Sequence, residues 1–128
     1  FLVASGVTLI EAQRLVRKLC TKCRKPTAPS KELLDELKFT PPAGATFFSA
    51  EGCRLCGGSG FKGRMGIIEV CEVDERIREL VVTRAPSWQI KEYAVKQQGM
   101  TTLHVDGLKK AEMGLTTLEE VLTATTED

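Results

Sequence analysis

The sequence predicts an α+β fold that is mostly helical, in which a small four-cysteine subdomain with a short β-hairpin is followed by a C-terminal helical bundle. The first observation is a pair of Cys-x-x-Cys motifs separated by a segment with several prolines and glycines. The second is the run from Arg64 to Val73, where Ile, Val and Met dominate, as is typical of a strand. The third is that apolar residues after Asp74 recur at helical spacing between capping residues.

The two motifs, here called the first and second knuckles, are Cys20-Thr21-Lys22-Cys23 and Cys53-Arg54-Leu55-Cys56. Two intervening residues let both sulfurs of a tight turn reach one ion at the zinc–sulfur distance of about 2.3 Å. Structural zinc takes four ligands, and the four cysteines at matched spacing are Cys20, Cys23, Cys53 and Cys56. The spacing therefore predicts a four-cysteine zinc-binding subdomain. Such a site has no open position for water or substrate, so we expect no catalytic residue there.

Three other interpretations of these thiols stay open: disulfides, a thioredoxin-like redox motif, and four incidental thiols. Disulfides are disfavoured because nothing in the sequence marks export, so a reducing cytoplasm is the expected compartment. A redox motif is disfavoured because neither knuckle follows a strand and opens a helix in a βαβ unit. Four thiolates suit iron as well as zinc, but the absence of redox features favours zinc.

Composition excludes several classes of function. The 128 residues are 42% hydrophobic and 27% charged, enough for one ordinary domain or two small ones. A net charge of +1 and an aromatic content of 5% argue against a nucleic-acid-binding surface or a base-stacking platform. No run approaches the roughly 20 apolar residues of a membrane span. The first six residues lack an initiator Met and read like a cut through a longer protein.

Before the first knuckle, apolar residues from Leu9 to Leu19 recur at helical spacing and predict a helix over Val7–Leu19. Basic residues gather between Arg14 and Lys25. One interpretation is a solvated helix end beside an anionic zinc–thiolate site, and the alternative is an anion-binding surface. The net charge near zero favours the first.

Between the knuckles, Ser30 predicts the N-cap of a short helix through Leu37, and Ala45–Ser49 predicts a short strand. We expect this strand to pair with the predicted strand Arg64–Val73 across the second knuckle. Glycines that follow Cys56 would let backbone amides turn towards the sulfurs. The lone Cys71 is expected to be a small buried hydrophobic residue outside the site.

The last part of the chain is predicted to be helical. Asp74 caps a helix that ends before Pro86, Ser87 caps a second that ends at Gly99, and a third spans Thr102–Met113. Thr117 and Glu120 have the spacing of a capping box for a fourth. His104, the only histidine, is expected to be a packed or surface residue rather than a ligand or a base.

Four segments resemble the metal-binding and C-terminal regions of the type II secretion and type IV pilus assembly ATPases. They are Ala12-Gln13-Arg14-Leu15-Val16-Arg17-Lys18-Leu19-Cys20-x-x-Cys23, Gly52-Cys53-x-x-Cys56-x-Gly58-x-Gly60-Phe61-x-Gly63-Arg64-x-Gly66-Ile67-x-Glu69, Gly99-Met100-x-Thr102-Leu103-x-x-Asp106-Gly107-Leu108 and Gly114-x-Thr116-Thr117-x-Glu119-Glu120-Val121-Leu122. They cover nearly the whole chain in one order. The combination of cysteine spacing with the Gly-Arg-x-Gly run is specific.

The resemblance implies a domain organisation and a cofactor. Residues 1–19 would be the end of the ATPase core with a connecting helix, 20–63 the metal-binding subdomain with Cys20, Cys23, Cys53 and Cys56 as ligands of a structural Zn²⁺, and 64–128 a strand with the helical subdomain. The phosphate-binding loop and the other nucleotide-binding motifs of the family lie upstream of the matching region. We therefore expect no ATPase activity from this chain alone, and ATP and Mg²⁺ only in the full-length parent.

The resemblance also implies partners. The parent would be a homo-hexamer in the bacterial cytoplasm, peripheral to the inner membrane, that contacts inner-membrane platform proteins, with no nucleic acid and no direct membrane insertion. Family members that drive retraction generally lack the knuckles, which favours the assembly and secretion branch. The alternative is a free-standing zinc-ribbon module, either co-chaperone-like or nucleic-acid-binding. The net charge of +1 argues against the nucleic-acid form, and a single glycine-rich cysteine repeat against the co-chaperone form.

Overall fold

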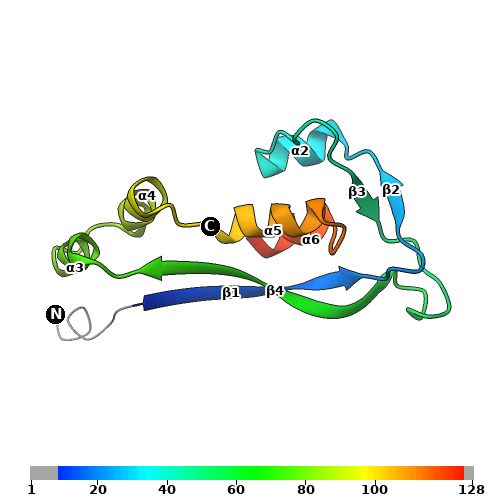
Figure 1. Cartoon of the computed structure of the whole chain (residues 1–128), viewed down its shortest axis with the longest axis horizontal. Helices are drawn as coiled ribbons and strands as arrows, with labels where there is room; N and C mark the ends of the chain where they lie inside the picture. Colours follow the sequence, from blue (N-terminus) through cyan, green and yellow to red (C-terminus); the bar gives the residue numbers. More distant parts are fainter. Residues whose placement is uncertain (1–8, 126–128) are drawn as a thin grey trace. The chain divides into compact units, whose positions relative to one another are not determined.

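The computed structural model describes residues 9–125 and has the predicted α+β character (Figure 1). Its strands form two separate two-stranded sheets, β1 with β4 and β2 with β3. The elements are β1 (Leu9–Leu19), β2 (Lys25–Thr27), α2 (Lys31–Leu37), β3 (Phe47–Ser49), β4 (Phe61–Glu72), α3 (Glu75–Val82), α4 (Ser87–Gln98), α5 (Leu103–Glu112) and α6 (Leu118–Thr125).

The chain divides into two compact units, each of which is described by itself. The first unit contains Ile68–Leu103 and the described residues up to Gln13, and the second contains Arg14–Ile67 and the described residues from His104 onward. Both knuckles belong to the second unit. None of the helices within residues 9–125 is long and apolar enough to cross a membrane.

The helix predicted over Val7–Leu19 is wrong, because Leu9–Leu19 is the strand β1, while Val7 and Thr8 lie outside the described residues. A helix would have buried its apolar stripe, but Leu9 and Leu15 are exposed and only Val16 and Leu19 are buried. The arrows of β1 and β4 run in opposite directions in Figure 1. The pairing of backbone groups with distant residues therefore outweighs the local helical periodicity.

The strand predicted over Arg64–Val73 is confirmed as β4, but its predicted partner is wrong. It pairs with β1, whereas β3 pairs with β2 in antiparallel register, with Pro26 opposite Phe48. Strand length gives the physical reason. The 12 residues of β4 match the 11 of β1, whereas β3 has only three and would leave most of β4 without a ladder partner. The predicted short β-hairpin across the second knuckle is therefore not formed. Instead, β2 and β3 form a three-residue ladder with α2 inserted between the two strands.

Local capping signals were good predictors of helix ends. The Ser30 hydroxyl accepts a hydrogen bond from the Leu33 amide at 3.1 Å, and the Asp74 carboxylate accepts one from the Ile77 amide at 2.9 Å. Helix α4 ends at Gly99 with a left-handed φ of 69°, as predicted. The predicted N-cap Ser87 is wrong, because Ser87 is the first residue of α4, Pro86 is its N-cap, and no side chain caps the helix.

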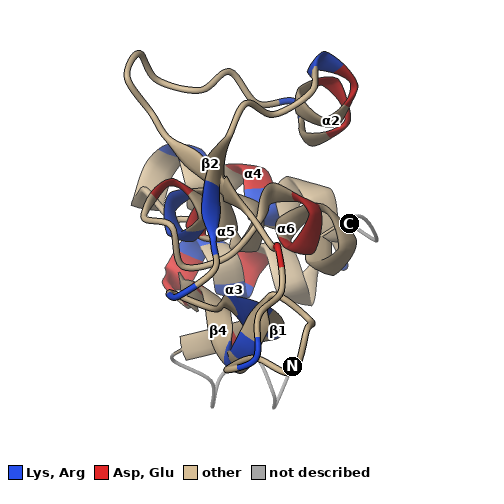
Figure 2. Cartoon of the chain, turned by 90° about the vertical axis from the view of Figure 1, so that its right-hand side faces the viewer, with Lys and Arg blue, Asp and Glu red and all other residues tan. Residues whose placement is uncertain are grey.

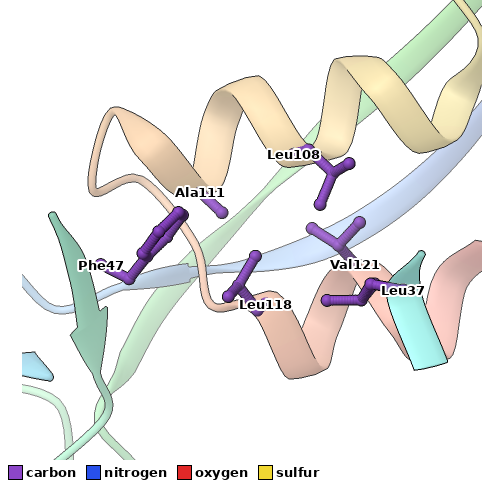
Figure 3. Close-up of a cluster of buried hydrophobic side chains, with 6 residues drawn as sticks. All are labelled: Leu37, Phe47, Leu108, Ala111, Leu118 and Val121. Atoms are coloured by element: carbon purple, nitrogen blue, oxygen red, sulfur yellow. The ribbon is translucent and has the colours of Figure 1, made fainter. Parts of the chain in front are cut away.

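The core of the second unit joins the insert between the knuckles to the last two helices (Figure 3). Leu108 on α5 and Val121 on α6 point towards each other, and Leu37 from α2 approaches the same cluster. Phe47 contributes an aromatic ring to this core, and its ring centroid lies 6.0 Å from that of Phe39 in an edge-to-face arrangement. The buried members of this core are Leu37, Phe47, Leu108, Ala111, Leu118 and Val121.

Glycine at position 107 lets α5 and α6 approach closely. A Cβ atom on Gly107 would lie 2.8 Å from a methyl carbon of Val121, closer than real Cβ contacts occur. His104, near the start of α5, is a packed residue as predicted, since its ring nitrogens lie 2.7 Å from the Leu37 carbonyl oxygen and 3.1 Å from the Thr125 hydroxyl.

The first unit is organised by Asp74, at the junction between β4 and α3. Its carboxylate accepts hydrogen bonds from the Tyr93 hydroxyl at 2.7 Å and from the Gln98 side-chain amide at 3.0 Å, in addition to the cap bond. These bonds connect the start of α3 and the C-terminal half of α4 to one residue. Ile77, Leu80 and Ala94 supply its buried apolar contacts.

Candidate metal centre

The fold brings the two knuckles together, although 29 residues of sequence separate Cys23 from Cys53. The first knuckle begins where β1 ends, and it is closed by a hydrogen bond from the Arg24 amide to the Cys20 carbonyl at 3.1 Å. The second knuckle is closed by a 2.8 Å bond from the Gly58 amide to the Cys53 carbonyl. The Cys20 amide also donates to the Gly60 carbonyl at 2.9 Å, which ties one knuckle to the exit of the other.

The four predicted sulfurs lie within 4.8 Å of one another. The Sγ atoms of Cys20 and Cys53 are 3.7 Å apart, those of Cys53 and Cys56 also 3.7 Å, and those of Cys23 and Cys56 3.9 Å. Four sulfurs placed tetrahedrally at about 2.3 Å from a zinc ion would be about 3.8 Å apart. These three separations match three edges of such a tetrahedron, and the other three pairs of sulfurs lie within 4.8 Å.

Backbone amides point at the sulfurs, as predicted for glycines near metal-bound cysteines. The Gly52 amide donates to the sulfur of Cys23 at 3.3 Å, and the amides of Cys53 and Gly60 donate to that of Cys56 at 3.2 Å. Such bonds stabilise negative charge on sulfur and fix its direction. Gly60 has a φ of 83°, and a Cβ atom on it would lie 2.6 Å from that of Ala50, so this position requires glycine.

The thiols differ in acidity. Burial opposes ionisation of Cys56, but the amides of Cys53 and Gly60 outweigh burial and lower its pKa to about 6. The amide of Lys22 lowers the pKa of Cys20 below its ordinary value, although burial again opposes this. Burial raises the pKa of Cys23 to about 11. Part of the set is therefore prepared for the thiolate form that metals bind.

The residues present fit a metal ion better than they fit disulfides. All five cysteines of the chain are free thiols, and the sulfur separations of 3.7–3.9 Å are far longer than a covalent S–S bond of about 2.05 Å. Four soft sulfur donors at tetrahedral separations suit zinc or iron. Cys71 is half-buried and does not belong to the cluster, in agreement with its exclusion from the predicted site.

The basic residues that flank the first knuckle include two arginines with defined contacts. The guanidinium of Arg17 lies 4.1 Å from the ring centroid of Phe61, and that of Arg24 lies 4.5 Å from that of Phe48. Arg24 also donates to the Gly114 carbonyl oxygen. Figure 2 shows part of β2 in blue, the colour of Lys and Arg. The predicted helix end is wrong, since Leu9–Leu19 is the strand β1, but most of the basic residues are exposed, as a solvated group would be. The alternative, an anion-binding surface, is not tested.

Sequence reasoning placed Arg17 and Arg24 among the basic residues beside the centre, but it did not place Glu120 there. The signal for Glu120 was a capping box, and Thr117 does accept the cap bond from the Glu120 amide at 3.1 Å. The carboxylate of Glu120, however, accepts two bonds from Arg17. A capping pattern describes neighbours in sequence, so it could not reveal a partner 103 residues away.

Comparisons with known proteins show which family the chain resembles. The family model of type II/IV secretion system proteins matches residues 1–123. The chain is 41% identical over 99% of its length to the type IV pilus assembly ATPase PilB of Thermus thermophilus, and 39% identical over its full length to the protein of the same name from Myxococcus xanthus. It is 35% identical over 99% of its length to the type II secretion system ATPase E of Vibrio cholerae.

The chain spans only a fraction of these relatives, covering 14% of the Thermus protein, 23% of the Myxococcus protein and 25% of the Vibrio protein. The family match nevertheless extends over nearly all of the chain and includes both knuckles. The chain therefore belongs to the family of type II/IV secretion system proteins.

Proposed function

We propose that this chain is the C-terminal, metal-binding portion of an ATPase that drives pilus assembly or type II secretion, and that its role there is structural. Cys20, Cys23, Cys53 and Cys56 hold one Zn²⁺, which joins the end of β1 to the start of β4. The observation that supports this most directly is the set of Sγ separations of 3.7–3.9 Å, which match a tetrahedral four-sulfur site.

Such a site stabilises the fold instead of performing chemistry. The apolar residues of the second unit gather between α2, β3, α5 and α6, and the knuckles themselves contribute only Cys20 to the buried hydrophobic residues. A small segment without its own core gains much of its folding free energy from a bound metal. When bound, zinc would supply this cross-link, and no substrate could reach the ion because four thiolates close its coordination shell.

The activity of the parent belongs to this proposal as well. The relatives are named as ATPases, so the full-length parent would bind ATP and Mg²⁺ and hydrolyse ATP, while this chain alone would not. The parent would be a homo-hexamer in the bacterial cytoplasm at the inner membrane, with neighbouring subunits and platform proteins as partners. In this role the protein would neither bind nucleic acid nor insert into the membrane.

Metal content tests the proposal first. Native mass spectrometry of this chain should show one zinc per molecule, and circular dichroism should show loss of structure after a strong chelator is added. No metal in a chain that is folded, with four free thiols, would overturn the metal-binding role.

The role in the parent needs a second experiment. Cys20→Ser in the full-length protein should lower pilus or secretion output while nucleotide binding stays near normal. The matched control is Cys71→Ser, which also replaces a thiol by a hydroxyl, but at a cysteine that lies outside the sulfur cluster. Normal output from the Cys20 variant would contradict the structural role.

A further inference from the structure

The turn between α5 and α6, residues 113–117, lies against the strand that enters the first knuckle. The Leu19 amide, one residue before the first ligand, donates to the Leu115 carbonyl at 2.9 Å. The Thr116 hydroxyl donates to the Arg17 carbonyl at 2.8 Å, and Thr116 is completely buried. The last residues of β1 are thus held by a segment about a hundred positions later in the chain.

Glu120, in the first turn of α6, holds the same strand from a second direction. Its carboxylate accepts a bond from the Arg17 backbone amide at 2.8 Å and another from the Arg17 guanidinium at 2.9 Å. These bonds lower the pKa of Glu120 even though burial opposes them, so the carboxylate is charged at neutral pH. The side chain of Glu120 is only 16% exposed, so solvent screens these bonds less than those of a surface pair.

The same contacts continue to the second knuckle. The Arg17 guanidinium lies over the ring of Phe61, and Phe61 follows Gly60, whose amide donates to the sulfur of Cys56. Gly60 also accepts the hydrogen bond from the Cys20 amide. A displacement of Arg17 would therefore reach both knuckles through bonded or stacked neighbours.

Arg24 makes the third connection. It directly follows Cys23, and its guanidinium donates to the Gly114 carbonyl while it lies over the ring of Phe48. The space at Gly114 is filled, since a Cβ atom there would meet both the Arg24 guanidinium and the Phe48 ring, and its φ is 75°. The turn and the exit of the first knuckle are fitted to each other at this point.

We propose that Glu120, Thr116 and Arg24 are positioning residues of the metal centre, so that metal binding and docking of the α5–α6 turn reinforce each other. This inference rests on the proposed metal-binding function. Outer contacts that orient metal ligands typically change metal affinity by about 10- to 100-fold when they are removed. Coupling between two binding events is reciprocal, so the bound metal must hold the turn in place to the same extent that the turn favours the metal.

Metal affinity of matched variants tests the first half of the coupling. The probe is Co²⁺, whose sulfur charge-transfer absorption reports ligation by the four thiolates, displaced by Zn²⁺ in competition. Glu120→Gln should weaken binding by about tenfold, and Thr116→Val by a similar factor. Glu119→Gln is the control, because Glu119 is exposed on the same turn of α6 and loses the same charge. All three are compared at a temperature where circular dichroism shows them folded.

Two negative results would have different meanings. If the unchanged chain bound neither Co²⁺ nor Zn²⁺, the proposed metal-binding function would fail. If the unchanged chain bound both ions and Glu120→Gln bound them with the affinity of Glu119→Gln, the metal-binding function would stand and the positioning role would be wrong.

Hydrogen exchange of the unchanged chain tests the second half and needs no variant. Removing the metal with a chelator should raise amide exchange in residues 113–121 by about tenfold or more, while α3 and α4, which belong to the other unit, serve as the internal reference. Unchanged exchange in residues 113–121, or an equal rise in α3 and α4, would overturn the specific coupling.

Discussion

The two carboxylate oxygens of Glu120 accept hydrogen bonds from the backbone amide and the guanidinium of one residue, Arg17, at 2.8 Å and 2.9 Å. The arginine side chain is 55% exposed, so the charge pair itself is partly screened by water. The bond to the backbone amide has a different consequence, because it fills a hydrogen-bonding position on β1 with a side chain from α6. The strand that leads to the first knuckle is thereby joined to the C-terminal helices.

Metal affinity should fall steeply as pH is lowered. Each thiol must lose its proton before it binds the ion, and burial raises the pKa of Cys23 to about 11, so protons compete with the metal well above neutrality. Cys56, with a pKa of about 6, competes only in more acidic solution. Zinc affinity measured by competition from about pH 8 down to about pH 6 should drop by at least tenfold per pH unit. A flat profile would indicate that thiolates do not ligate the metal.

Asp74 should make the stability of the first unit sensitive to acid. The Ile77 amide and the Tyr93 hydroxyl hold the pKa of Asp74 below its ordinary value. A group with a lowered folded-state pKa stabilises the fold above its unfolded pKa of about 3.9, and this contribution is lost as pH falls through the folded value. Exchange protection of α3 should therefore fall below about pH 4.

Two variants separate the charge of Asp74 from its capping bond. Asp74→Asn keeps an oxygen that can accept the cap bond, so it should retain most stability at neutral pH and lose the acid dependence. Asp74→Ala removes the cap and the bond to Tyr93, and it should lower the melting temperature by about 5 °C at neutral pH. An Asn variant with an unchanged acid dependence would show that another carboxylate is responsible.

Gly107→Ala should destabilise the chain, although alanine is the better helix former. A Cβ atom at position 107 would lie 2.8 Å from one Val121 methyl and 3.2 Å from the other, so α5 and α6 would have to separate. Overpacking of this kind costs about 1–3 kcal/mol, against a gain of about 1 kcal/mol in helix propensity. The net loss is measured by urea unfolding. Lys109→Ala, at an exposed position of the same helix, is the control and should stay within about 0.5 kcal/mol.

Phe47→Ala should destabilise the second unit strongly and also weaken metal binding. Phe47 is buried, and it connects β3 to the core formed by α2, α5 and α6. Loss of a buried Phe costs about 3–5 kcal/mol. Thermal unfolding of the metal-bound chain should show a large decrease in midpoint. Phe39→Ala, which truncates the partly buried edge-to-face partner, should have a smaller effect. If both variants lowered the unfolding midpoint equally, burial of the Phe47 side chain would not be what stabilises β3.

Features that depend on near neighbours could be predicted from the amino-acid sequence. Spacing of two residues within each knuckle predicted the sulfur cluster of Cys20, Cys23, Cys53 and Cys56, and the structure brings these four together. Ser30, Asp74 and Thr117 predicted helix starts, and Gly99 predicted a helix end, because capping involves residues three or four positions apart.

Features that depend on distant partners became apparent only in the folded chain. Leu9–Leu19 has helical periodicity, yet it forms a strand because β4 and the α5–α6 turn satisfy its backbone. The partner of β4 was decided by strand length, and the role of the Glu120 carboxylate by an arginine 103 residues earlier. Local patterns encode short-range bonds, whereas pairing over long separations depends on which surfaces the whole chain can bury together.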